Sequence, residues 1–167
     1  NSAFDYCKSL EKIDLPDNID EIPNKLFYSC RNLRLIELPR SIKKIGEYAF
    51  SCCESLEKID IPENITEIET NAFSGCMNLK SIKLPKNIKK IGENTFCNCE
   101  NLSEIELPNG ITEISVGAFK GCKNLKFIKL PQSIKKIQEY TFANYKGLEK
   151  IELPSSITEI PIGTFKD

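Results

Sequence analysis

The chain has 167 residues, a formal net charge of −1, 40% hydrophobic and 28% charged residues, and no histidine. This mixture is typical of a folded chain that buries one core, and it excludes a disordered segment. Near-neutral charge without long lysine blocks argues against nucleic acid as a partner, and no apolar stretch is long enough to predict membrane insertion within this segment.

The same residues recur every 23 positions from one end of the chain to the other. A phenylalanine column comprises Phe4, Phe27, Phe50, Phe73, Phe96, Phe119, Phe142 and Phe165. Leucine and isoleucine columns run beside it with the same period. A fixed period with apolar residues at constant offsets predicts a repeat solenoid, because each unit can bury its apolar face only against its neighbours.

The elements expected within one unit follow in chain order. Ile13 and Leu15 alternate with polar residues as in a strand, and Pro16, which lacks an N–H donor, ends that strand in a turn. Residues 19–22, with isoleucines at both ends, predict a second short extended segment. The stretch before each phenylalanine, for example ETNAF at 69–73, predicts one helical turn.

The order of residues within one unit is L-x-x-I-x-L-P, then I-x-x-I, then A-F-x-x-C. It resembles the 23-residue class of leucine-rich repeats in BspA-like surface proteins. The resemblance covers residues 1–167 as a single leucine-rich repeat array of about seven repeats. It implies a solenoid that is mainly β with short helical turns, built as a right-handed curved array of parallel strands. It also implies a protein-protein interaction module for adhesion or ligand binding, at the cell surface or secreted.

Six of the eight cysteines share one column, three residues after the phenylalanines. They are Cys7, Cys30, Cys53, Cys76, Cys99 and Cys122, and Tyr145 takes the seventh place. We expect buried free thiols there, with disulfides between neighbouring units as the alternative. The chain lacks histidine, and the two close cysteine pairs, Cys52 with Cys53 and Cys97 with Cys99, lie two units apart. No metal or other cofactor is therefore expected. Cys52 and Cys97 lie off the column and are the expected reactive thiols.

The second extended segment carries charges that alternate in sign from unit to unit. They are Glu21, Lys44, Glu67, Lys90, Glu113, Lys136 and Glu159. Stacked units would place opposite charges side by side, so the pattern predicts a device that maintains the register of the stack. A striped binding surface is the alternative interpretation.

On the first strand, the residues that flank each buried isoleucine should point outward, and they differ among units. The candidate binding face comprises Lys12, Leu35, Lys58, Ser81, Glu104, Phe127, Lys129 and Lys150. Leu35 and Phe127 are apolar at positions predicted to be exposed, so we expect them to anchor a protein ligand. Isolated surface hydrophobic residues are also common, and that interpretation stays open.

No catalytic residues are predicted, because histidine is missing and no phosphate-binding glycine loop occurs. The alternative to a surface binding module is an intracellular, cytoplasmic scaffold or a structural spacer without a direct ligand. Two sequons, at Asn64 and Asn101, would allow glycosylation on a secretory route. Both chain ends fall inside a unit, which predicts a longer parent protein or copies that associate end to end through uncapped termini.

Overall fold

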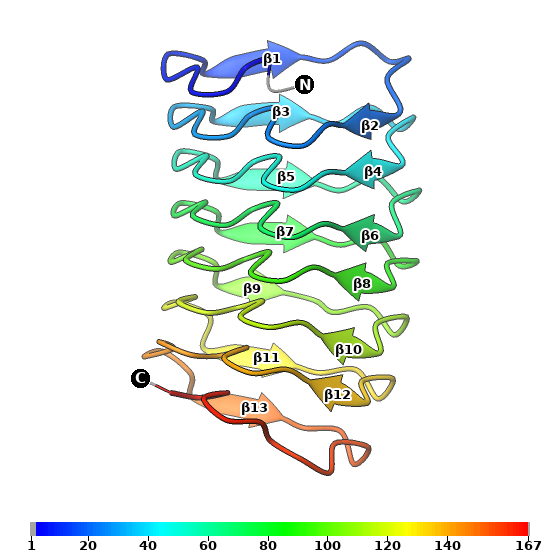
Figure 1. Cartoon of the computed structure of the whole chain (residues 1–167), viewed down its shortest axis with the longest axis vertical. Coiled ribbons are helices and arrows are strands. Elements are labelled where there is room, and N and C mark those ends of the chain that lie inside the picture. The colour runs from blue at the N-terminus through cyan, green and yellow to red at the C-terminus, as the bar shows by residue number, and fades with distance from the viewer. Residues whose placement is uncertain (1–2, 167) are drawn as a thin grey trace.

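Two short strands form in most units of the computed structural model, which describes residues 3–166 (Figure 1). The first strands are β1 (Lys12–Asp14), β3 (Leu35–Glu37), β5 (Lys58–Asp60), β7 (Ser81–Lys83), β9 (Glu104–Ile105), β11 (Phe127–Lys129) and β13 (Lys150–Glu152). The second strands are β2 (Glu21–Ile22), β4 (Lys44–Ile45), β6 (Glu67–Ile68), β8 (Lys90–Ile91), β10 (Glu113–Ile114) and β12 (Lys136–Ile137). The proline that follows each first strand ends it, as the sequence predicts.

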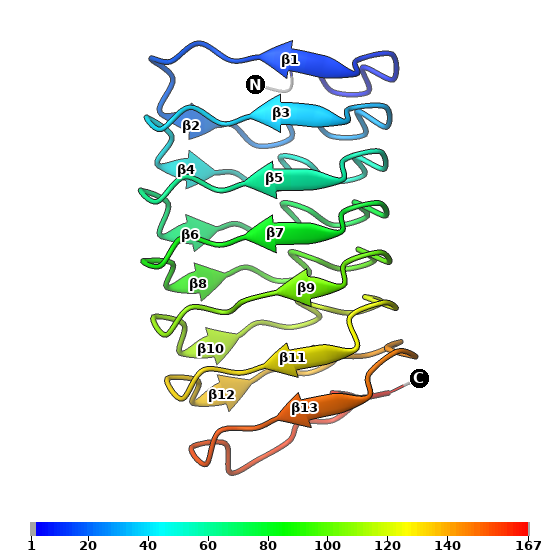
Figure 2. The ribbon, with the colours of Figure 1, turned by 180° about the vertical axis from the view of Figure 1, so that it is seen from behind.

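All strand pairs are parallel, and each residue lies beside its equivalent 23 positions away, as Ile13 does with Ile36. Figure 1 shows the second strands in front, and Figure 2 shows the first strands from the other side. The two views together show a coil that winds in the right-handed sense from N to C terminus. The predicted repeat solenoid of parallel strands is confirmed.

The hydrogen-bonded ladders of strands are interrupted. The first strands form the groups β1–β3, β5–β7–β9 and β11–β13, and the second strands form β2–β4–β6–β8 and β10–β12. Within residues 3–166, the junction where β8 meets β10 and β9 meets β11 is therefore the place where neither ladder continues.

The phenylalanine column forms the centre of the core. Six of its rings, from Phe27 to Phe142, are 0% exposed. Successive rings are stacked, with centroids 5.3 Å apart between Phe50 and Phe73 and 5.9 Å apart between Phe119 and Phe142. Isoleucine and leucine side chains of every unit surround these rings in one continuous cluster. The repeat period therefore places the core where the sequence predicts it.

The predicted helical turn before each phenylalanine is wrong. The segment instead consists of consecutive β-turns, with Lys25 and Ser29 in the left-handed region at φ 58° and 56°. Cys30 N–H closes one turn onto the carbonyl of Phe27 (3.1 Å), whereas Phe27 N–H donates to Ala49 of the next unit (2.9 Å). A helix would keep both bonds within the unit, so the stack favours turns that release every second N–H for the neighbour.

No helix forms within residues 3–166, and that part of the chain accordingly holds no helix that is long and apolar enough to cross a membrane.

The cysteine column lies inside the coil. Cys30, Cys53, Cys76, Cys99 and Cys122 are 0% exposed, and all eight cysteines are free thiols. Each of the five donates to the carbonyl of the phenylalanine 26 residues earlier, as Cys76 Sγ does to Phe50 O at 3.1 Å. Burial raises the pKa of every thiol in this set, that of Cys30 to about 11. The thiols are neutral donors that fill the core.

The two cysteines off the column are half-buried. Burial also raises the pKa of Cys97, although Lys120 and Ser74 oppose the shift. Cys97 is therefore a poorer nucleophile than its position outside the column predicts. The prediction of a reactive thiol stays open for Cys52. Within residues 3–166, no three side chains of the metal-binding types lie together.

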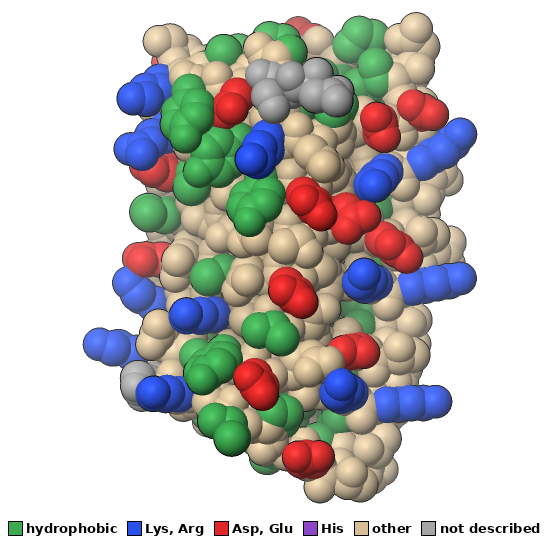
Figure 3. Space-filling view, viewed as in Figure 1, with side chains coloured by type: hydrophobic (Ala, Val, Ile, Leu, Met, Phe, Trp, Pro, Cys, Tyr) green, Lys and Arg blue, Asp and Glu red, His purple; other side chains and the backbone are tan. Residues whose placement is uncertain are grey.

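Charge alternation places opposite charges in register, as at Glu21 beside Lys44 and Glu67 beside Lys90. Lysine and arginine side chains project at both edges of the side that carries the second strands, with acidic side chains among them (Figure 3). Lys44 nevertheless pairs with Glu69 (3.5 Å) rather than with a residue of its own column. The alternation sets the local charge balance, and its role in register stays a prediction.

The last unit exposes apolar side chains. Phe165 stacks on Phe142 with ring centroids 5.6 Å apart and is 40% exposed, and Ile162 is 80% exposed. A further unit or a second copy could cover these groups, so end-to-end association stays a prediction, which light scattering at high concentration tests.

Candidate functional site

The outward residues of the first strands form one array, here called the strand face. Parallel pairing in register sets Lys12 beside Leu35 and Phe127 beside Lys150, so each variable side chain has a fixed neighbour. The candidate residues on this face are all exposed except Ser81, which is half-buried. Leu35 is 48% exposed and Phe127 is 46% exposed. Their exposure agrees with the alternation of the strand.

Leu35 and Phe127 do not form one patch. They belong to β3 and β11, four units apart, which corresponds to about 19 Å at the usual spacing of paired strands. One compact ligand group cannot contact both. The strand face therefore offers two separate apolar anchors.

Ion pairs within single strands organise the charged part of the strand face. Lys58 pairs with Asp60 (3.4 Å), and Lys150 pairs with Glu152 (2.8 Å). The hydrogen bond and the charge of Lys150 lower the pKa of Glu152 below its ordinary value. The Lys150 ammonium also lies over the Phe127 ring, 5.8 Å from its centroid. Phe127 is thus held by a cation on one side.

A depression of about 480 Å³ opens in the middle of the strand face. Its lining consists of Lys58, Asp60, Ser81, Ile82, Lys83, Ser103, Glu104, Ile105, Glu106 and Phe127. Four of the eight candidate residues meet here, namely Lys58, Ser81, Glu104 and Phe127. Lys12, Leu35, Lys129 and Lys150 lie outside it. Sequence reasoning did not select the other six lining residues, Asp60, Ile82, Lys83, Ser103, Ile105 and Glu106. Ser103 is small in a column that otherwise carries charged side chains, but only the strand register shows that it lies next to Ser81.

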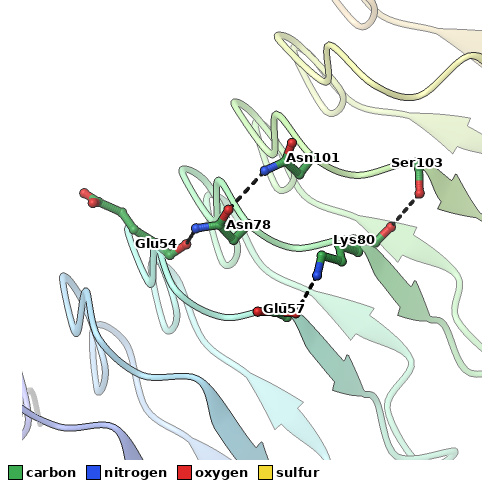
Figure 4. A network of polar contacts seen from close by, with 6 residues as sticks. All are labelled: Glu54, Glu57, Asn78, Lys80, Asn101 and Ser103. Carbon is green, nitrogen blue, oxygen red and sulfur yellow. Dashed lines mark hydrogen bonds and ion pairs between the residues drawn. The ribbon is translucent and has the colours of Figure 1, made fainter.

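Both sequon asparagines use their side-chain amides within the coil. Asn64 Nδ2 donates to Arg40 O at 2.9 Å. Asn101 Nδ2 donates to Asn78 Oδ1 at 3.0 Å, as the close-up of the turn network shows (Figure 4). Asn124 continues this ladder onto Asn101 (2.9 Å). A glycan at either position would modify an amide nitrogen that already donates a hydrogen bond to the preceding unit, so glycosylation stays a prediction for both asparagines.

The turn network also includes an ion pair near the strand face. Lys80 Nζ contacts Glu57 at 2.6 Å, and Ser103 Oγ donates to Lys80 O at 3.2 Å (Figure 4). The Lys80 ammonium lowers the pKa of Glu57. These bonds fix the turns that precede β7 and β9, and so position the strands that line the depression.

Known proteins share both the repeat and the coil. A family model for the BspA type leucine rich repeat region matches residues 1–115 and 89–167 with 6 copies. The chain belongs to this family. Membership makes it a repeat module for protein interaction, of a type that acts as a scaffold and not as an enzyme. No match was found among curated proteins.

Solved bacterial structures have the same fold. A leucine-rich repeat protein from Bacteroides ovatus is 37% identical, with a TM-score of 0.91 over 93% of this chain and 40% of that one. A leucine-rich repeat protein of T. pallidum is 33% identical, with a TM-score of 0.83 over 87% of this chain and 71% of that one.

A leucine rich cell surface protein from Faecalibacterium prausnitzii is 28% identical, with a TM-score of 0.66 over 99% of this chain and 59% of that one. The chain thus spans less than two thirds of this protein and of the Bacteroides protein.

Proposed function

We propose that the chain binds a protein ligand through the strand face, as an adhesion module at the cell surface or in secreted form. The observation that carries this proposal is the contrast between the two sides of each first strand. Inward positions hold the same isoleucine in every unit, whereas the outward positions beside them change from Lys12 to Leu35 to Ser81 to Phe127. A rigid frame with a variable surface suits recognition of a protein.

The surface location draws support from the relatives. The Faecalibacterium prausnitzii protein is described as a cell surface protein, and its identity to this chain is 28%. The strand face itself is mixed in charge and has exposed apolar groups, which is typical of surfaces that bind proteins. An intracellular scaffold is the competing function, and the location of the ligand decides between the two.

A capture experiment tests the proposal. Immobilised wild-type chain is compared with Phe127→Ser and with Met77→Ser, a matched control whose side chain is 43% exposed outside the strand face. Each is incubated with surface proteins and, separately, with a cytoplasmic extract. We expect a surface protein that the wild type and Met77→Ser retain and that Phe127→Ser loses.

Equal capture by all three chains would remove Phe127 from the binding surface. Specific capture from the cytoplasmic extract alone would favour the intracellular scaffold.

A further inference from the structure

Two small residues create the depression in the strand face. Ser81 and Ser103 stand where every other unit has a long side chain, such as Lys58 in the column of Ser81 and Lys80 in the column of Ser103. Stacking in register brings these two gaps close together, because Ser81 of β7 pairs with Glu104 of β9 and Ser103 directly precedes Glu104. The opening therefore belongs to this place in the array and does not repeat along it.

The floor of the opening is apolar. Ile105 is half-buried here, whereas its equivalents Ile82 and Ile128 are 4% and 0% exposed. β9 is one residue shorter than β7 and does not pair with β11, which leaves Ile105 less covered. The Phe127 side chain borders the same opening from the β11 side. A ligand group here meets an aliphatic floor and an aromatic wall.

The charges around the opening are not balanced. Three carboxylates, Asp60, Glu104 and Glu106, face two ammonium groups, Lys58 and Lys83. Lys58 pairs with Asp60 at 3.4 Å. Glu104 and Glu106 flank Ile105 in the sequence, and among residues 3–166 no ion pair within 4 Å involves either of them. Negative charge is thus available next to Ile105 and Phe127.

We propose that this depression binds an arginine side chain of the protein ligand. The methylene groups of the arginine pack on Ile105 and Ile82. The planar guanidinium contacts the Phe127 ring and donates to Glu104, with Ser81 and Ser103 as hydroxyl acceptors at the rim. This inference rests on the proposed function, because the strand face must be the ligand surface.

Other side chains fit the depression less well. An acidic side chain would meet Glu104 and Glu106. An aliphatic side chain would bury these carboxylates without a partner, which costs free energy. Lysine offers a point charge, whereas guanidinium is planar and more weakly hydrated, so it both stacks on an aromatic ring and pairs with a carboxylate.

A peptide titration tests the site without the natural ligand. The full chain, labelled with ¹³C at isoleucine methyl groups, is titrated with acetyl-Gly-Arg-Gly-amide and observed by NMR. We expect saturable shifts at Ile105 with millimolar affinity, since few atoms make contact. The same peptide with citrulline, which keeps the shape and lacks the charge, is expected to bind at least about fivefold more weakly. We expect the same peptide with lysine to bind with an affinity between those of the arginine and citrulline peptides.

Variants locate the binding. Glu104→Gln should weaken arginine-peptide binding at least about fivefold, and Phe127→Ser should weaken it as well. Met77→Ser, at an exposed side chain outside the strand face, should leave it unchanged. The isoleucine methyl spectrum of each free variant reports whether the coil is intact, because the core isoleucines lie in every unit.

Absence of a saturable shift, equal binding of the citrulline peptide, or full binding by Glu104→Gln would overturn the arginine site. The capture experiment remains independent of this titration. If Phe127→Ser loses capture and the titration fails, the strand face remains the ligand surface, and arginine is rejected as the group that it binds. Arginine binding together with equal capture by all chains would instead reject the strand face as the ligand surface.

Discussion

Two sides of the coil hold the units together to different degrees. The turn side comprises the β-turns around each phenylalanine, and the strand side comprises the first and second strands. On the turn side, Phe96 N–H donates to Ala118 O at 2.9 Å and the rings of Phe96 and Phe119 stack at 5.6 Å. At the same junction, neither β8 with β10 nor β9 with β11 forms a ladder. The turns therefore provide continuous cohesion, which leaves the strand side free to vary and to open a depression.

The largest expected effect comes from the ring stack. Phe96→Ala should lower the free energy of unfolding by about 3–5 kcal/mol, because it leaves a cavity between two fully buried rings. Phe127→Ala, an equal truncation on the strand side, should cost under about 1 kcal/mol. Urea unfolding of the two variants measures the difference. Similar losses for both would remove the distinction between the two sides.

The buried thiols make the turn side sensitive to alkaline pH. Folding raises the pKa of Cys30 from 9.0 to about 11, and it raises the pKa of Cys99 in the same direction by burial. A raised thiol pKa contributes stability that is complete below about pH 9 and is lost as pH rises toward and beyond 11. Unfolding free energies between pH 8 and 11 should therefore fall.

The control for the pH experiment is Cys99→Ala, which has one thiol fewer. Its stability is lower at pH 8, and it should fall less steeply above pH 9 than that of the wild type. Parallel slopes would assign the alkaline loss to the lysines and tyrosines instead.

A turn residue in the left-handed region gives a smaller effect. Gly121 has φ +74°, and an added Cβ would collide with Asn98 Oδ1 of the preceding unit. Gly121→Ala should cost about 1–2 kcal/mol. Ser103→Ala, on the strand side, should stay within about 0.5 kcal/mol. Thermal unfolding compares the pair, and a neutral Gly121→Ala would show that the turns adapt.

The smallest expected effect is a gain in stability. Tyr145 occupies the cysteine column, is 6% exposed, and has a buried hydroxyl without a hydrogen-bond partner. Tyr145→Phe should therefore stabilise the chain by about 1 kcal/mol. Tyr6→Phe, at a side chain that is 58% exposed, should change stability by less than about 0.5 kcal/mol. A destabilised Tyr145→Phe chain would mean that a water or a protein group satisfies the hydroxyl.

The core could be predicted because each buried column has six to eight members at a constant period, which shows which residues share an environment. The turn conformation could not, since Lys25, Tyr48 and Cys52 occupy left-handed positions that residues of these types seldom adopt. Stacking imposes that conformation through bonds between units. A single unit, from which the helical turn was predicted, does not contain those bonds.

The strand face was predictable as a surface but not as a site. Alternation along the strand identified Leu35 and Phe127 as exposed. The depression depends on two serines in different columns meeting across adjacent strands, and on the lost pairing next to β9. Small residues on a variable face carry no periodic signal, so only the three-dimensional register reveals their effect.

Amide hydrogen exchange tests the central claim most directly, that the hydrogen bonds and stacked rings of the turn side hold the units together at the β9 to β11 junction, where both strand ladders are interrupted. The account predicts that the amide of Phe96, which bonds across this junction, exchanges with the same free energy as that of Phe73, which bonds across an uninterrupted part. Both should report unfolding of the whole array. Much faster exchange at Phe96 than at Phe73 would show that the coil opens into two halves there, and would contradict the account.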